Sequence, residues 1–136
     1  MMKASELIQL AARAREKAYA DYSGYKVGAA LLAKNGKVYL GCNVENAVYP
    51  AGTCAERTAI FSAVADGVRE FSKIAIVGGS GDRFAGYAYP CGICRQVMRE
   101  FCDDSFEIIL YDGKKQLKKT LAELLPCSFS KEDLKY

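Results

Sequence analysis

Apolar residues recur along the chain at two spacings, one typical of helices and one typical of strands. Near the start, Leu7, Ala11, Ala14 and Ala18 follow the helical spacing, with charged residues on the opposite side. This pattern predicts a first helix over residues 5–20. Ser5 is a suitable N-cap for it, because its hydroxyl can accept a hydrogen bond from a free backbone N–H of the first turn.

Two apolar runs, "VGAALLAK" and "KVYLGCNV", follow this helix and flank Asn35-Gly36. An Asn-Gly pair between two apolar runs predicts a β-hairpin. The first run contains only small residues at positions 28–30. Because small residues leave room beside a strand, we expect another element to pack closely against it.

The second half of the chain alternates helical and strand patterns. It predicts a helix that starts after "GTC" and ends at Gly67, a buried strand in "KIAIVGG", a third helix near 91–102, a strand–turn–strand in "EIILYDGKKQLKK", and a last helix in "TLAELLP" with a capping box of Thr120 and Glu123. Helices between strands imply crossover connections. We therefore predict a three-layer α/β/α fold with a mixed sheet of about five strands, formed by a single domain over residues 1–136.

Composition narrows the range of functions. The chain has 136 residues, a formal net charge of +3, six cysteines and no histidine. The charge is too small to indicate binding to nucleic acid or to a membrane. The densest basic run, "DGKKQLKK", is better explained as a solvated surface hairpin than as a nucleic-acid patch. We therefore expect neither nucleic acid nor a membrane as a partner.

The first twenty residues carry charges throughout and have no apolar core of the kind that signal peptides contain. No apolar run reaches the roughly 18 residues of a membrane-spanning helix. We therefore expect a cytoplasmic protein. In a reducing compartment its cysteines would be thiols, metal ligands or catalytic groups rather than disulfides.

The "PCGIC" segment places Cys91 and Cys94 at the start of the third helix. A C-x-x-C at a helix start is typical either of a redox dithiol or of half a zinc site. Cys54 lies at the start of another helix, and we expect the two helix N-termini to meet. These three cysteines would then bind zinc. A zinc ion with three protein ligands keeps a fourth position open for water.

The other three cysteines belong to no paired motif, and we interpret Cys42, Cys102 and Cys127 as packing or surface thiols. Three thiolates around zinc would leave the site anionic. Arg57 or Arg95 could offset this charge by hydrogen-bonding to ligand sulfurs.

Glu56 is the predicted acid–base group, although residues two apart in a helix point about 200° away from each other. It could share a site with Cys54 only if the metal lies beyond the helix end. We therefore predict Cys54 at the N-cap of the helix and Glu56 in its first turn. The alternative is an ordinary carboxylate favoured near a helix N-terminus by the helix dipole.

The segments "YSGYKVGAALL", "GCNVENAVYP", "CAERTAIFSAV", "PCGICRQVM" and "ELLPCSFSKEDL" resemble the small zinc-dependent cytidine deaminases that act on free nucleosides. In this variant of the deaminase signature a cysteine stands where histidine is usual. The resemblance implies one zinc ion per chain, a homotetramer and a role in pyrimidine salvage. It also implies conversion of cytidine and deoxycytidine to uridine and deoxyuridine with release of ammonia.

The same resemblance implies a role for each matching residue. Cys54, Cys91 and Cys94 would bind zinc. Glu56 would take a proton from the zinc-bound water, pass one to ring N3 and later assist the leaving amine. The resemblance also implies a set of substrate contacts: the backbone N–H of Ala55 with the pyrimidine carbonyl, Asn43 and Glu45 with the ribose hydroxyls, Tyr25 near the base, and Phe129 in the active site of a neighbouring copy.

Three other classes of function are compatible with parts of this pattern. A deaminase of another substrate, such as blasticidin S, would share the zinc site and differ in the pocket. A nucleic-acid deaminase would need basic and aromatic surfaces to hold a strand. A structural zinc or redox module would need no Glu56.

Overall fold

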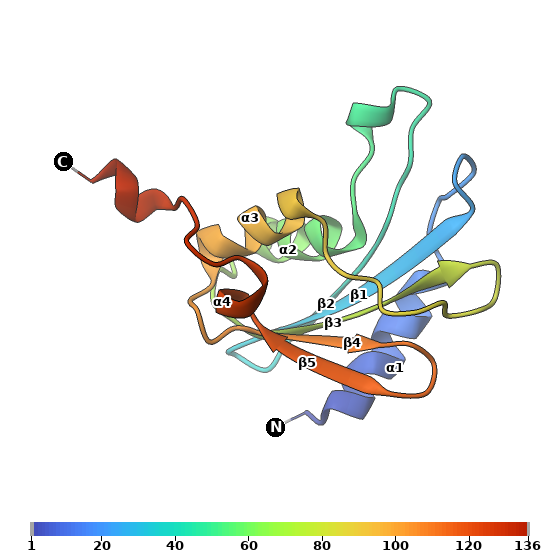
Figure 1. The fold of residues 1–136 in the computed structure, drawn as a ribbon, viewed down its shortest axis with the longest axis horizontal. Helices are drawn as coiled ribbons and strands as arrows, with labels where there is room; N and C mark the ends of the chain where they lie inside the picture. Colours follow the sequence, from blue (N-terminus) through green and yellow to red (C-terminus); the bar gives the residue numbers. More distant parts are fainter. Residues whose placement is uncertain (1, 136) are drawn as a thin grey trace.

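The computed structural model describes residues 2–135, and Figure 1 shows how its elements are arranged. A five-stranded sheet in the order β2-β1-β3-β4-β5 forms the centre. Only β3 and β4 pair in parallel, and the other neighbours are antiparallel. The strands are β1 (Tyr25–Ala33), β2 (Val38–Cys42), β3 (Phe71–Ser80), β4 (Glu107–Tyr111) and β5 (Gln116–Thr120).

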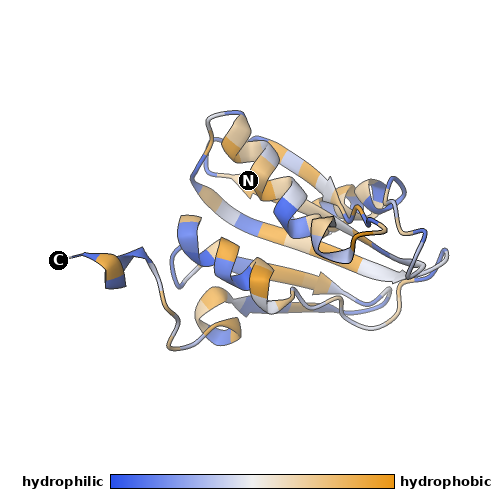
Figure 2. Ribbon diagram, turned by 90° about the horizontal axis from the view of Figure 1, so that it is seen from above, coloured by the Kyte–Doolittle hydropathy of each residue, from blue (hydrophilic) through white to orange (hydrophobic). Residues whose placement is uncertain are grey.

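Helices cover both faces of this sheet, as the sequence predicts. The first helix, α1 (Ala4–Arg15), covers one face, while α2 (Ala55–Ala65) and α3 (Gly92–Phe101) cover the other. Successive side chains of β1 point to opposite faces of the sheet: Leu31 packs with α2, and Leu32 packs with α1. In Figure 2 apolar and polar bands alternate along the helices, in keeping with elements that have one buried side.

Most of the predicted turns and caps are present. Gly36 adopts a left-handed φ of 89° at the β1–β2 hairpin, and Gly67 one of 86° directly after α2. The capping box of Thr120 and Glu123 starts the short helix α4 (Leu121–Leu124), and a further short helix, η2, covers Lys131–Leu134.

The prediction for the first helix was wrong at both ends. The N-cap is Lys3 rather than Ser5, so the Ser5 side chain is not a cap. The helix ends at Arg15 rather than near residue 20, because the following residues turn to bring Tyr19 into a bridge with Val44. Helical spacing within the sequence cannot reveal this contact with a distant strand end.

Two glycines let the helices lie directly on the sheet. A Cβ at Gly28 would stand 2.0 Å from the carbonyl oxygen of Ala11 in α1, and one at Gly41 would stand 2.3 Å from that of Ala55 in α2. No real Cβ fits at such distances. The close packing predicted beside residues 28–30 is therefore present, and Gly41 sets the position of the first turn of α2.

Arg15 is a buried cation at the end of α1, with 6% of its surface exposed. Its guanidinium donates to the carbonyl oxygens of Lys26 (3.0 Å) and Gly79 (2.7 Å), and also to those of residues 81 and 83. It lies 5.3 Å from the ring centroid of Phe84. Arg15 thus ties α1 to β1, β3 and the loop that leads toward α3, with backbone carbonyls as its hydrogen-bond acceptors.

Replacing Arg15 by methionine should destabilise the protein by about 3 kcal/mol, because several buried carbonyls would lose a charged donor. Urea unfolding at a fixed protein concentration measures the change. Arg13→Met is the matched control, since Arg13 is exposed on the same helix. Equal losses in the two variants would contradict the role assigned to Arg15.

Among residues 2–135, no helix combines the length and the apolar character that crossing a membrane requires.

Candidate functional site

The N-termini of α2 and α3 point to the same place above the sheet. Cys54 is the N-cap of α2 and Cys91 is the N-cap of α3, both in extended backbone conformation. Their carbonyl oxygens accept the first helical hydrogen bonds, from Thr58 and Arg95 respectively. The predicted placement of Cys54 at a cap is therefore confirmed, and Glu56 lies in the first turn of α2.

Three thiols gather between these helix ends. Sγ of Cys91 lies 3.8 Å from Sγ of Cys54 and 3.5 Å from that of Cys94. All three sulfurs lie within 4.8 Å of one another, and no other group of three potential ligands occurs in the described part of the chain. Tetrahedral zinc with Zn–S bonds of about 2.3 Å requires sulfurs about 3.8 Å apart, so this cluster fits zinc.

Arg57 supplies positive charge to this cluster. Its Nη2 donates to Sγ of Cys54 at 3.2 Å. The neighbouring Cys94 thiol and the Arg57 guanidinium lower the pKa of Cys54 to about 5. The pKa of Cys94 is raised, first by the neighbouring Cys54 and then by burial. Positive charge from Arg57 therefore favours the thiolate form of Cys54.

Arg95 points elsewhere. Its guanidinium donates to the carbonyl oxygens of Pro90 and Leu124, each at 2.7 Å, and to no sulfur. The sequence left open whether Arg57 or Arg95 balances the thiolate charge. In the structure Arg57 contacts a thiol, and Arg95 binds two carbonyl oxygens instead.

Glu56 is almost fully enclosed, with 4% of its surface exposed. Burial raises the pKa of its carboxyl group to about 7, because the charged form loses its hydration. A carboxyl group with such a pKa can accept and donate protons near neutral pH, as acid–base catalysis requires. Ala55, the residue between Cys54 and Glu56, is also buried.

A cavity of about 520 Å³ opens beside the cysteine cluster. Its lining comes from residues 22–23, 43–46, 49, 52–54 and 57, so it includes neither Ala55 nor Glu56. Both Cys54 and Arg57 lie on its wall, and so do Asn43 and Glu45. A larger cavity of about 760 Å³ lies between the ends of α2 and α3 and residues 130–132, and it contains none of the predicted site residues.

Asn43 follows directly after β2 and binds the first residues of β1, whereas Glu45 binds the segment before β1. Asn43 accepts from the backbone N–H of Val27 at 2.9 Å and donates to the carbonyl oxygen of Tyr25 at 2.8 Å. Glu45 accepts from two backbone N–H groups and from the hydroxyl of Ser23. The hydroxyl of Ser23 is the main reason why the pKa of Glu45 is lowered.

Comparison with known proteins agrees with this geometry. The family model described as the cytidine and deoxycytidylate deaminase zinc-binding region matches residues 1–110, which include all three clustered cysteines. The chain belongs to this deaminase family.

Individual relatives agree with the family match. The chain is 49% identical over 136 residues to a cytidine deaminase of Sporosarcina psychrophila, covering 99% of this chain and 97% of the relative. It is 32% identical over 130 residues to a blasticidin-S deaminase of Bacillus cereus, covering 93% and 91%. The crystal structure of cytidine deaminase from Burkholderia pseudomallei superposes with a TM-score of 0.87 and 49% identity, covering 94% of this chain and all of that one.

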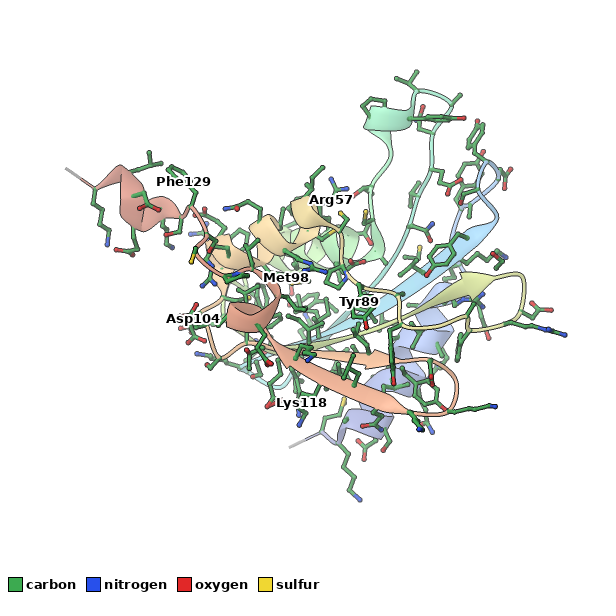
Figure 3. All side chains as sticks on the ribbon, in the orientation of Figure 1. Arg57, Tyr89, Met98, Asp104, Lys118 and Phe129 are labelled. Atoms are coloured by element: carbon green, nitrogen blue, oxygen red, sulfur yellow. The ribbon has the colours of Figure 1, made fainter. Side chains whose placement is uncertain are left out.

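Phe129 lies outside the matched deaminase region and away from the cysteine cluster. It sits on the segment after α4, which projects from the body of the molecule in Figures 1 and 2, and Figure 3 shows it apart from Arg57. Its side chain is 62% exposed. The single chain therefore does not bury this ring in its own core.

Ser23 and Thr53 line the cavity beside the cysteine cluster, and neither was predicted from the sequence. Ser23 binds Glu45, and its hydroxyl also accepts from the backbone N–H of Tyr25 at 3.0 Å. Thr53, directly before Cys54, lies on the pocket wall. Its buried hydroxyl has no hydrogen-bond partner among the described residues. The only available signal for Ser23 was its position before Gly24, where a turn was to be expected.

Proposed function

We propose that this chain hydrolyses the amino group of cytidine and deoxycytidine, giving uridine or deoxyuridine and ammonia. The observation that carries the proposal is the meeting of three thiols at two helix N-termini with a buried carboxyl group, Glu56, in the adjoining turn. Zinc bound by Cys54, Cys91 and Cys94 would lower the pKa of a water molecule and so supply the nucleophile.

In this reaction a C4–O bond forms on the pyrimidine and the C4–N4 bond breaks. Glu56 takes a proton from the attacking water and delivers one to ring N3. It then helps to protonate the amino group that leaves as ammonia. Its burial and its pKa of about 7 suit these successive transfers. Arg57 keeps the thiolate charge balanced throughout.

The resemblance to cytidine deaminases suggests how a nucleoside would be held, and two of the residues concerned, Asn43 and Glu45, lie on the pocket wall. The backbone N–H of Ala55 would bind the pyrimidine carbonyl, and Tyr25 would lie near the base. Asn43 and Glu45 would bind the ribose hydroxyls. Their present hydrogen bonds leave room for this, because an amide has a second N–H and a carboxylate has further lone pairs.

We further propose that the chain acts as a homotetramer in which Phe129 of one copy completes the site of another. The exposure of large apolar side chains supports association: Val48, Tyr49, Phe61 and Ile93 are each at least half exposed. Phe129 itself is exposed and remote from its own cysteine cluster.

Light scattering on the purified protein should give the mass of four chains. The same measurement on Phe61→Ser serves as a comparison, because removing an exposed aromatic ring from an interface weakens association. A wild-type mass of one chain at micromolar concentration would contradict the tetramer.

A cytoplasmic location and a role in pyrimidine salvage belong to the same proposal. All six cysteines are free thiols in the structure, which suits a reducing compartment. Cell fractionation checks the location, and recovery of the protein outside the cytosol would contradict it. Growth on cytidine as the only pyrimidine source checks the salvage role, which predicts that deleting the gene prevents such growth.

Blasticidin S is the second candidate substrate, supported by the relative that is 32% identical over 130 residues. A steady-state comparison of cytidine, deoxycytidine, adenosine, blasticidin S and a cytosine-containing oligonucleotide separates the possibilities. We expect the two cytosine nucleosides to be turned over with the highest kcat/KM. Negligible turnover of cytidine, with zinc measured in the same sample, would refute the proposed activity.

A further inference from the structure

The structure ties the chain after α4 to α3, the helix that begins at Cys91. We call residues 125–135 the C-terminal arm. Two consecutive α3 residues hold it, one at its root and one on the arm itself. Arg95 donates to the carbonyl oxygen of Leu124, the last residue of α4, at 2.7 Å, and Gln96 donates through Nε2 to that of Phe129 at 2.9 Å. The arm otherwise projects from the body (Figure 1).

Arg95 connects the root of the arm with the loop that carries a zinc ligand. Its Nε donates to the carbonyl oxygen of Pro90, the residue before Cys91, while its Nη1 reaches Leu124. A guanidinium group is rigid and planar, so the two carbonyl oxygens are held at a set separation. A lysine could not satisfy both in this way, because it presents a single charged group.

Gln96 sets the direction of the phenylalanine. The hydrogen bond turns the Phe129 carbonyl oxygen toward α3, and the ring remains exposed. Between the two anchors Cys127 adopts a left-handed φ of 51°, which turns the chain. Such a conformation is uncommon for a residue other than glycine, and the contacts on both sides help to hold it.

We propose that Arg95 and Gln96 are positioning residues that fix the C-terminal arm on α3 and so aim Phe129. This inference rests on the proposed function, in which Phe129 serves another copy. A ring that must enter a neighbouring pocket is more effective when its backbone is already held, since less conformational freedom is lost on docking. The two residues therefore act on substrate binding through the arm and touch no reacting atom.

A double-mutant cycle between Gln96→Glu and Phe129→Ala tests the inference. Glutamate has the size of glutamine, but as a carboxylate it cannot donate to a carbonyl oxygen. We expect Gln96→Glu to raise KM for cytidine about 3- to 10-fold, the usual effect of one hydrogen bond, with kcat nearly unchanged. In the Phe129→Ala background it should add no further increase, because the ring that it aims is gone.

The matched control is Gln9→Ala, an exposed glutamine on α1, which should leave KM unchanged. An increase in KM of the same size in both backgrounds would overturn the inference. So would an unchanged KM in Gln96→Glu when Phe129→Ala raises it. An unchanged KM in Phe129→Ala would instead refute the proposed role of Phe129 itself.

Limited trypsin digestion tests the anchoring without reference to catalysis. Cleavage after Lys131, which lies on the arm, should be several-fold faster in Gln96→Glu and in Arg95→Lys than in the wild type and in Gln9→Ala. Equal cleavage rates in all four proteins would show that the arm is not held by these residues and would overturn the inference whatever the kinetics.

Discussion

Glu56→Gln is expected to remove nearly all cytidine turnover while zinc and fold remain. Among residues 2–135, Glu56 is the one buried carboxyl group, and it lies in the helical turn that follows Cys54. Glutamine keeps its shape and hydrogen-bonding capacity but cannot exchange a proton. General acid–base groups typically contribute about 10²- to 10⁴-fold, and Glu56 would serve several proton transfers. We therefore expect kcat to fall by at least the upper part of that range.

The experiment measures kcat, zinc content and circular dichroism on the same preparation. Glu100→Gln is the matched control, because Glu100 is an exposed glutamate on α3. It should keep wild-type turnover. If Glu56→Gln retains kcat within about twofold of wild type while it binds zinc, the acid–base role is wrong and a structural zinc or redox module becomes the better explanation.

Cys91→Ala is expected to release zinc and, with it, all measurable activity. The substitution removes one of three thiol ligands, and the remaining two sulfurs cannot hold the ion against solvent. Because bound zinc also stabilises the folded state, the midpoint of thermal unfolding should fall. A chelator should lower that midpoint in the wild type and leave it unchanged in Cys91→Ala.

Cys102→Ala is the control for loss of a cysteine as such. Burial raises the pKa of the Cys102 thiol to about 12, so this residue stays protonated, and it lies outside the cluster. Metal analysis after gel filtration should find wild-type zinc in this control and none in Cys91→Ala. Full zinc occupancy in Cys91→Ala would show that the ligand set is wrongly assigned.

The elements of the fold could largely be predicted from local patterns. The hairpin at Asn35-Gly36, the end of α2 at Gly67 and the capping box at Thr120 depend on residues close together in the chain. The end of α1 could not be predicted, because the turn after Arg15 depends on a bridge between Tyr19 and Val44. Helical spacing continued to Ala18 and gave no sign of it.

The site was predictable in its residues but not in its contacts. Cys54, Cys91 and Cys94 are recognisable from their spacing and from their helix starts, and they do come together. No local sequence pattern distinguishes Arg57 from Arg95. Only the structure shows that Arg57 binds a thiol and that Arg95 binds two carbonyl oxygens. The roles of the cysteines and of Glu56 in catalysis are predictions that the experiments above test.

Residue type and short-range spacing are enough to predict the order of helices and strands, the thiol chemistry and the absence of a histidine from the site. Which side chains share an environment depends on the tertiary structure. It enclosed Glu56 and so raised its pKa, it buried Arg15 among distant carbonyl oxygens, and it left Phe129 exposed on the arm. Burial and hydrogen bonding are set by segments far apart in the chain, so they appear only when the sheet has brought those segments together.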